Sequence, residues 1–300
     1  MKKVQVLIST YNGEKYLIHL LDSVLNQKNV EVSIFVRDDG STDGTVNILN
    51  IYSDQGKLKW YSGKNKGAAF SFLDLLSKSG DYDYYAFCDQ DDIWLQDKLY
   101  VAVSKLEAMG NFEKPQLYYG CPRLVDNSLR DLPIPKEMLE KYVDFSKAFV
   151  RSNCFGCTMV FNRELKQRIK IPDFVTMHDE WVHKICLLFD GAVFFDDDVH
   201  ILYRQHGDNT VGVNTNLLAR AAKFARQIIK KDRNRSKLAK EILRLYGNEI
   251  DLSRKRLLIE LSEYNLSILN KVKLLLDRRF CVKYYKKDIM FKFAVCIGAL

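Results

Sequence analysis

The chain has 300 residues, of which 47% are hydrophobic and 12% are aromatic, and its formal net charge is +8. This composition excludes an intrinsically disordered protein, and the length suits one large domain or a domain with an appendage. The charge is uneven, because residues 215–300 hold 21 Lys and Arg against 8 Asp and Glu, whereas residues 1–214 hold 25 against 30. The basic C-terminal part therefore needs an anionic partner or surface, and the acidic part carries the candidate chemistry.

The alternation of strand-like and helix-like segments over residues 1–110 predicts an α/β fold. Strands are predicted at 4–9, 31–37, 57–61 and 82–88, from continuous or alternating apolar runs. Helices are predicted at 14–27, 43–52, 68–77 and 95–109, from apolar spacing of three to four residues. This order indicates a Rossmann-like, mostly parallel, doubly wound sheet.

The second half of the chain is less regular and then becomes helical. Short strands are predicted at 116–120, 158–161, 193–195 and 201–203, with a helix at 176–189. From 217 to 276 Leu and Ile recur at helical spacing among many Lys and Arg residues. We therefore predict a catalytic domain over 1–214 and a basic helical appendage over 215–300.

Cysteine usage and the chain start indicate a reducing compartment. The seven cysteines are an odd number and lie mostly in apolar runs, which favours buried thiols over disulfides. Cys154 and Cys157 have C-x-x-C spacing, but no second pair or histidine stands at zinc-finger spacing, so the spacing argues against zinc. The start Met1-Lys2-Lys3 leads directly into a strand, with no secretory core and no bilayer-length apolar run. We expect a cytoplasmic protein, or one on the cytosolic face of the cell membrane.

The most informative stretch is Cys88-Asp89-Gln90-Asp91-Asp92-Ile93-Trp94, which follows the predicted strand at 82–88. Carboxylates at the carboxyl end of a strand lie where open α/β sheets bind ligands. Three so close together repel one another unless a cation neutralises them, and Mg²⁺ or Mn²⁺ prefers such oxygen ligands. The alternative is a solvated acidic turn, since Asp favours turns and helix starts.

Two further polar loops follow the first two strands. Ser9-Thr10-Tyr11-Asn12-Gly13 offers small and polar groups, and Arg37-Asp38-Asp39-Gly40 offers an acidic pair that can bind a nucleobase or ribose. No G-x-G-x-x-G fingerprint is present, and Asp43 is better explained as a helix cap. Each loop alone could be an ordinary β–α turn. Because all three loops follow parallel strands, we expect them to share one edge of the sheet.

The order I-S-T-Y-N-G, R-D-D-G-S-T-D-G-T and D-Q-D-D-I-W-L resembles the family 2 glycosyltransferases, which have the GT-A fold. Segments 156–165, 177–181 and 203–206, with Asn209 and Val211, resemble the bacterial rhamnosyltransferases of that family. The resemblance covers roughly residues 3–213, and its motifs are specific only in combination. The chain after 215 carries no motif of the family.

The resemblance implies a role for five residues at the donor site. Thr10, Tyr11 and Asp39 match the positions that hold the base and ribose of a nucleotide-sugar. Asp89 and Asp91 match the D-x-D motif. The donor diphosphate and its divalent cation, Mg²⁺ or Mn²⁺, are expected there, with Asp91 as the metal ligand.

The resemblance also implies a catalytic base in the segment His178-Asp179-Glu180. Asp179 matches the base position. Many relatives have an aromatic residue where Glu180 stands, which leaves both acids as candidates. The alternative for Asp179 is a carboxylate that only caps the start of a helix.

Five other residues are candidates, and four of them have a structural alternative. His206 could touch the metal or pyrophosphate, or be a hydrogen-bonded loop histidine. The Arg204 guanidinium could donate two hydrogen bonds to the diphosphate oxygens, or pair with a nearby Asp. Trp94 and Trp181 could stack on sugar faces or fill the core. Gly156 lies in a segment that we assign to the acceptor or sugar.

The sequence therefore predicts an inverting, metal-dependent glycosyltransferase. Its donor would be a nucleotide-sugar, dTDP-L-rhamnose or a UDP-sugar, and its acceptor a hydroxyl of a cell-surface polysaccharide or lipid-linked glycan. A sugar nucleotidyltransferase would need a Gly-rich loop with Arg and Lys, which Ser9–Leu17 lacks. A non-catalytic scaffold would show gaps in the acidic set, and none is missing.

The basic tail suggests peripheral membrane contact. From Phe280 to Leu300 aromatic residues, among them Tyr284 and Tyr285, interleave with lysines, as in an interfacial helix on anionic lipid. The alternative is a solvated helical hairpin. Nucleic-acid binding is disfavoured, because no recognition motif is present.

Overall fold

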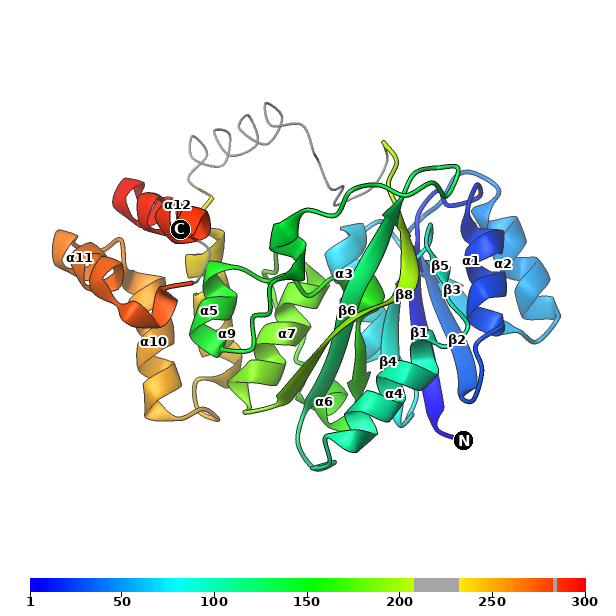
Figure 1. Cartoon of the computed structure of the whole chain (residues 1–300), viewed down its shortest axis with the longest axis horizontal. Helices are drawn as coiled ribbons and strands as arrows, with labels where there is room; N and C mark the ends of the chain where they lie inside the picture. The colour runs from blue at the N-terminus through cyan, green and yellow to red at the C-terminus, as the bar shows by residue number, and fades with distance from the viewer. Residues whose placement is uncertain (208–231, 283–284) are drawn as a thin grey trace. The chain divides into compact units, whose positions relative to one another are not determined.

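The computed structural model describes residues 1–207, 232–282 and 285–300, and these form two compact units (Figure 1). The first unit comprises residues 1–141, 154–171 and 177–207. The second comprises residues 142–153, 172–176 and the described residues after 231. The predicted boundary at 214/215 lies outside the described residues. The sequence pattern did not predict that two short segments before it belong to the second unit.

The first unit is built on a single eight-stranded sheet of order β3-β2-β1-β4-β7-β6-β8-β5. Its parallel half consists of β1 (Lys3–Thr10), β2 (Glu31–Asp38), β3 (Leu58–Ser62) and β4 (Tyr84–Asp89). All four strands were predicted, with ends that differ by no more than two residues. Along β1, the side chains of Val4, Val6, Leu7 and Ile8 have no exposed surface. A strand buried on both faces needs such a continuous apolar run.

The other half of the sheet is mixed. It consists of β5 (Ile93–Trp94), β6 (Gln116–Val125), β7 (Val160–Asn162) and β8 (Ala192–Arg204). β7 is antiparallel to β4 and β6, β8 is parallel to β6, and β5 is antiparallel to β8. The two strands predicted at 193–195 and 201–203 are one strand. A change of register opposite Gly120 and Cys121 lets β8 continue through the acidic residues that interrupt its apolar pattern.

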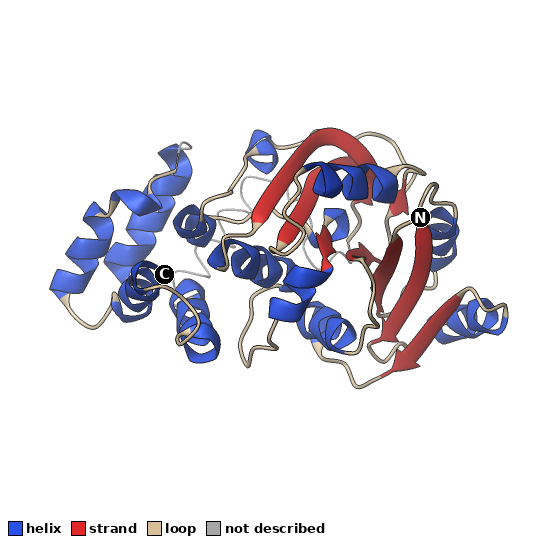
Figure 2. Ribbon diagram, turned by 90° about the horizontal axis from the view of Figure 1, so that it is seen from below, coloured by secondary structure: helices blue, strands red, loops and turns tan. Residues whose placement is uncertain are grey.

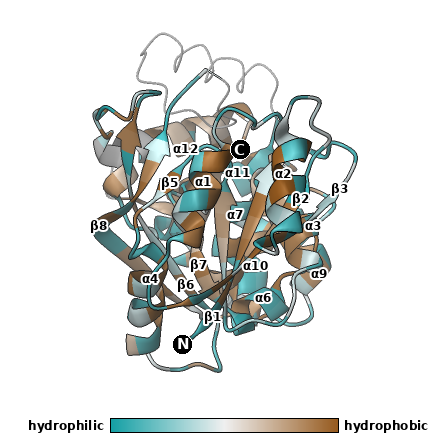
Figure 3. Ribbon diagram, turned by 90° about the vertical axis from the view of Figure 1, so that its right-hand side faces the viewer, coloured by the Kyte–Doolittle hydropathy of each residue, from teal (hydrophilic) through white to brown (hydrophobic). Residues whose placement is uncertain are grey.

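Helices cover the sheet, whose strands are predominantly hydrophobic at the centre of this unit (Figures 2 and 3). They are α1 (Leu17–Leu25), α2 (Thr45–Asp54), α3 (Gly67–Ser77), α4 (Lys98–Ala108), α6 (Arg163–Arg168) and α7 (His178–Leu188). Helix α7 contacts both α3 and α6, and α1 contacts α2. Short 3₁₀ turns form η1 (Lys136–Leu139) and η2 (Gly156–Thr158). The fold is that of the predicted class, a mixed sheet with helices and a helical C-terminal part.

The second unit is helical. It contains α5 (Phe145–Val150), α9 (Asn234–Tyr246), α10 (Leu252–Glu263), α11 (Ile268–Leu276), η3 (Arg278–Phe280) and α12 (Tyr285–Ile297). Its core side chains include Leu238, Ile242, Leu258, Leu261 and Tyr264. No helix among the described residues has the length and apolar character needed to cross a membrane.

The exposed apolar surface of this unit differs from the prediction. Phe280 and Phe291 are buried and stack on each other at 5.5 Å between ring centroids, and Val295 is fully buried. The predicted interfacial segment 280–300 thus contributes partly to the core, while Ile289, Met290 and Phe293 remain 37–46% exposed and Tyr284 lies outside the described residues. The most exposed apolar side chains lie earlier, in and just before α11, where Leu266, Ile268, Leu269 and Leu276 are 76–82% exposed.

Candidate active site

The loops that follow β1, β2 and β4 lie together at the carboxyl edge of the sheet, as their parallel order predicts. The backbone N–H of Tyr11 donates to Gln90 Oε1 at 2.9 Å, and Gln90 Nε2 donates back to the Tyr11 carbonyl at 3.0 Å. The Asn12 N–H donates to Ser41 Oγ at 2.9 Å. The Tyr11 side chain is 49% exposed, so it is free to meet a ligand at this edge.

Asp38, predicted only as one half of the acidic pair, organises two of these loops. It is fully buried, and its carboxylate accepts hydrogen bonds from the Thr10 hydroxyl and from the backbone N–H groups of Gly40 and Ser41. Gly40 has a φ of +88°, a conformation that favours glycine. Thr10, predicted to touch the donor, therefore uses its hydroxyl to hold Asp38.

Asp39 shapes the neighbouring loop. It is 2% exposed, forms an ion pair with the buried Arg37 guanidinium, and accepts hydrogen bonds from the backbone N–H groups of Lys66 and Gly67. Both carboxylate oxygens are engaged in this way. A nucleobase or ribose would share these acceptors with the loop amides.

Asp91 and His206 place two metal-binding atoms side by side. His206 Nε2 lies 2.7 Å from Asp91 Oδ2, and both side chains are nearly buried. The His206 ring stacks on Tyr16 at 4.9 Å, and the Tyr16 hydroxyl donates to Asn127 Oδ1 at 2.9 Å. Tyr16 and Asn127 were not predicted, because neither belongs to a motif.

Arg204 holds the acidic loop rather than facing it as a free fork. Its side chain is 4% exposed, and Nε and Nη1 donate to the backbone carbonyls of Asp91 and Asn127 at 2.9 and 3.0 Å. Its backbone N–H donates to Asp92 Oδ1 at 3.1 Å. These hydrogen bonds give Arg204 a positioning role in the loop, and its predicted contact with the diphosphate stays a prediction.

Asp89 and Asp179 belong to the same electrostatic site. Burial and the neighbouring carboxylates of Asp91 and Asp179 raise the pKa of Asp89. Burial likewise raises the pKa of Asp179 to about 6, against hydrogen bonds from backbone N–H groups that lower it. Asp179, which the sequence assigned to the acceptor, therefore lies close enough to Asp89, which it assigned to the donor, to raise the pKa of Asp89.

Gly156 positions Asp179. The Gly156 N–H donates to Asp179 Oδ2 at 3.0 Å, and a Cβ at this residue would lie 2.6 Å from His178 Nε2. His178 is buried between Phe72 and Phe87, with ring centroids at 4.1 and 4.8 Å. Burial lowers the pKa of His178 to about 3, so its ring is neutral and only Asp179 can exchange protons in this pair.

Three other predicted residues, Glu180, Trp94 and Trp181, are engaged in contacts of their own. Glu180 Oε1 accepts from Lys184 Nζ at 2.6 Å, so this acid is engaged with a fully buried lysine. Trp94 and Trp181 are 2% and 0% exposed, which makes sugar stacking by either wrong and the core alternative right. Trp181 Nε1 donates to the Lys170 carbonyl at 3.1 Å, and the Lys98 ammonium lies 3.6 Å above the Trp94 ring.

Comparison with known proteins settles the family. A family model described as glycosyl transferase family 2 matches residues 5–169. The chain belongs to glycosyl transferase family 2. It is 30% identical over 227 residues to the dTDP-rhamnosyl transferase RfbG of Shigella flexneri, covering 71% of this chain and 76% of RfbG. It is 25% identical over 219 residues to the glycosyltransferase GlyG of Streptococcus pneumoniae serotype 4, covering 68% and 71%.

Solved glycosyltransferases share the GT-A fold of this family 2 enzyme. S. aureus TarS 1-349 in complex with UDP-GlcNAc aligns with a TM-score of 0.58 and 17% identity, covering 99% of this chain and 82% of TarS. The mannosyltransferase PcManGT from Pyrobaculum calidifontis, in complex with GDP-Man and Mn2+, aligns with a TM-score of 0.55 and 16% identity, covering 99% and 87%. At these identities the likeness concerns the fold alone.

The Gly156→Ala variant tests how tightly Asp179 is placed. The added Cβ collides with the buried His178 ring, so we expect a loss of about 1–3 kcal/mol in the free energy of unfolding, typical of overpacking. Because the same movement displaces Asp179, the transfer rate should fall with it. Gly207→Ala is the matched control, since a Cβ there meets no atom within 4 Å. Equal melting temperatures of the two variants would contradict the assignment.

Proposed function

We propose that this family 2 glycosyltransferase is an inverting, metal-dependent enzyme that transfers L-rhamnose from dTDP-rhamnose. The acceptor would be a hydroxyl of a cell-surface polysaccharide or lipid-linked glycan. The relative named dTDP-rhamnosyl transferase, at 30% identity over most of both chains, supports this donor. A UDP-sugar is the alternative donor.

The observation that carries the chemistry is the convergence of four side chains at one sheet edge, namely Asp89, Asp91, Asp179 and His206. Asp91 Oδ2 and His206 Nε2 lie 2.7 Å apart, at hydrogen-bond distance, so a small movement would let both bind one cation, and a carboxylate with an imidazole fits Mn²⁺ or Mg²⁺. When bound, such an ion neutralises charge on a departing diphosphate. Asp91 and His206 would hold it, and Arg204 and Tyr16 would keep these two side chains in place.

Asp179 is the proposed general base. Its carboxylate is partly accessible, is oriented by the N–H groups of Gly156 and Glu180, and lies close enough to Asp89 to shift its pKa. A base placed there would take the proton of the acceptor hydroxyl as the oxygen attacks the anomeric carbon. With a single base and no protein nucleophile, the anomeric centre inverts. Tyr11 and the loops that Asp38 and Asp39 hold would receive the nucleotide.

A panel of nucleotide-sugars tests this function. Purified protein is incubated with dTDP-rhamnose, UDP-GlcNAc, UDP-glucose or GDP-mannose, with Mg²⁺ or Mn²⁺, and with or without lipid-linked glycan acceptor. We expect acceptor-dependent release of dTDP from dTDP-rhamnose. Release of UDP or GDP in its place would overturn the donor, and no diphosphate release from any donor would overturn the activity.

We also propose that the second unit brings the enzyme to the cytosolic face of an anionic membrane, where lipid-linked acceptors lie. The apolar face of α11 consists of Ile268, Leu269, Val272 and Leu276, which are 43–82% exposed. Lys273, Arg278 and Arg279 lie beside it and are themselves exposed. Apolar side chains rimmed by basic ones suit insertion at the interface of an anionic bilayer.

The double variant Leu269→Glu, Leu276→Glu tests this surface. Each leucine contributes about 1.5–3 kcal/mol when buried, so the partition into vesicles containing phosphatidylglycerol should fall about 100-fold or more. Both side chains are 76% exposed, so the fold is expected to persist. Binding is measured by vesicle co-sedimentation, with Ile51→Glu on α2 as a control that replaces an exposed apolar side chain by glutamate elsewhere. Unchanged partitioning would remove α11 from this role, and conversion of a dimer to a monomer would assign the face to self-association.

A further inference from the structure

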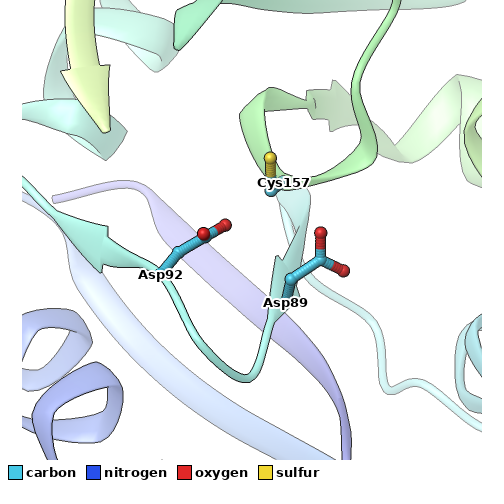
Figure 4. A group of neighbouring side chains, drawn as sticks. All are labelled: Asp89, Asp92 and Cys157. Carbon is cyan, nitrogen blue, oxygen red and sulfur yellow. The ribbon is translucent and has the colours of Figure 1, made fainter. Parts of the chain in front are cut away.

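A second group of metal-binding side chains lies beside the Asp91–His206 pair, and of its three members only Asp89 belongs to the proposed donor site. It consists of Asp89 at the end of β4, Asp92 in the following loop, and Cys157 in η2 (Figure 4). One oxygen of each carboxylate and the Cys157 Sγ all lie within 4.8 Å of one another. Because the three residues come from separate segments, the spacing of cysteines in the sequence could not reveal the group.

Asp92 is the strongest indication that this group binds something. Its side chain is 1% exposed, and Oδ1 accepts the Arg204 N–H. Oδ2 accepts no hydrogen bond from a nitrogen or hydroxyl donor among the described residues, and the Cys157 thiol is the one side chain that donates to this carboxylate. A buried carboxylate served only by a weak thiol donor is poorly satisfied, and a cation between Asp92 and Cys157 would satisfy it.

We propose that Asp89, Asp92 and Cys157 form a binding site for a thiophilic divalent cation of the Zn²⁺ type, distinct from the Asp91–His206 pair. Thiolate sulfur selects Zn²⁺ over Mg²⁺ and Mn²⁺, and Asp and Cys are both ordinary zinc ligands. Ligand atoms in a tetrahedral zinc site are about 3.5 Å apart, so small side-chain rotations close the present spacing. The Cys157 thiol gives its proton to solvent as the metal–sulfur bond forms.

The surrounding charges favour a doubly charged ion. Lys98 is 1% exposed, has no hydrogen-bond partner for its ammonium group among the described residues, and interacts electrostatically with Asp92 and Cys157. Two carboxylates, one thiolate, this ammonium and Zn²⁺ together carry no net charge. Asp89 is only partly buried, so an ion can enter from its side.

Zinc in this site would inhibit transfer, a consequence that rests on the proposed function. Asp89 would be withdrawn from the donor, and the loop that carries Asp91 would be held by a second ion. We expect micromolar Zn²⁺ to inhibit the enzyme in the presence of millimolar Mg²⁺. The inhibition constant should rise at least tenfold in Cys157→Ser, measured against the uninhibited rate of that variant.

The direct test uses Co²⁺ as a spectroscopic probe and needs neither donor nor acceptor. The full chain with Cys281→Ser and Cys296→Ser is the starting protein, because these two cysteines are exposed and could bind metal on their own. We expect a thiolate-to-cobalt charge-transfer band in the near ultraviolet that Zn²⁺ abolishes. Adding Cys157→Ser should remove the band, while adding Cys121→Ser, a buried cysteine on β6, should leave it.

Two results would overturn the site. One is the absence of the band in the starting protein, which does not depend on any variant of the cluster folding. The other is a band that survives Cys157→Ser in protein with an unchanged circular dichroism spectrum. Asp92→Asn provides a second variant, for which we expect at least tenfold weaker Zn²⁺ binding by calorimetry. Because the band is read without catalysis, a failure here is separable from a failure of the proposed activity.

Discussion

Asp179→Asn is expected to lower the rate of sugar transfer by about 10²–10⁴-fold, the usual contribution of a general base. Asn keeps the shape of the side chain and can still accept the Gly156 N–H, so the fold and the donor affinity should change little. The measurement is a kcat from diphosphate release, with donor binding followed separately by calorimetry. A variant that keeps the full rate would remove Asp179 from the reaction.

The pH dependence gives the same residue a second readout. Burial raises the pKa of Asp179 to about 6, and the base acts only in its ionised form. Transfer therefore requires a pH above this value, and kcat/KM, which reports the free enzyme, should fall tenfold per pH unit below about 6. Asp179→Asn should lose this inflection.

Glu180→Gln is the matched control, because it changes the adjacent acid in the same way. Glu180 is engaged with the buried Lys184, so its loss should lower the melting temperature. It should keep the inflection near pH 6. If the inflection disappears in Glu180→Gln and persists in Asp179→Asn, Glu180 is the general base and Asp179 is not.

The parallel half of the sheet and its three polar loops were predictable from the sequence. Largely apolar runs such as Val4–Ile8, in which only Gln5 is polar, have no stable place except a strand buried on both faces. The polar residues that interrupt these runs then fall at one edge, since parallel strands end together. The position of the acidic loop 89–92 at this edge therefore follows from the sequence alone.

The supports of the site were not predictable, because they are contacts between residues far apart in the chain. Arg204 was expected to meet phosphate, and its donation to the carbonyls of Asp91 and Asn127 was not expected. Tyr16 has the spacing of a core helical residue, and its stacking on His206 depends on how β8 ends. Trp94 was ambiguous for the same reason, since amphipathic aromatic residues suit both a sugar face and a core.

The basic tail shows a different limit. Its composition indicated an anionic partner, and its Leu and Ile spacing indicated helices, as the described residues confirm. Composition does not say which helix faces inward. Phe291 and Val295 fill the core of the second unit, and the exposed apolar face falls on α11.

Asp91→Asn is expected to abolish metal-dependent transfer, with a loss of at least 10²-fold in kcat. The substitution removes the charge that opposes a divalent cation while keeping an acceptor for His206, so the loop held by Arg204 should stay in place. Mn²⁺ affinity, measured from the electron paramagnetic resonance signal of the free ion, should fall at least tenfold. In the unaltered protein, removal of metal with EDTA should stop transfer and added Mg²⁺ should restore it.

Asp97→Asn is the control for this prediction, since Asp97 is an exposed acid a few residues further on that pairs with His200 instead. It should keep both Mn²⁺ affinity and rate. Full activity after EDTA treatment would contradict metal dependence for the whole enzyme. Retained Mn²⁺ binding in Asp91→Asn would instead move the catalytic ion away from the Asp91–His206 pair. The two outcomes differ because the first concerns the requirement for a cation, and the second concerns which side chains hold it.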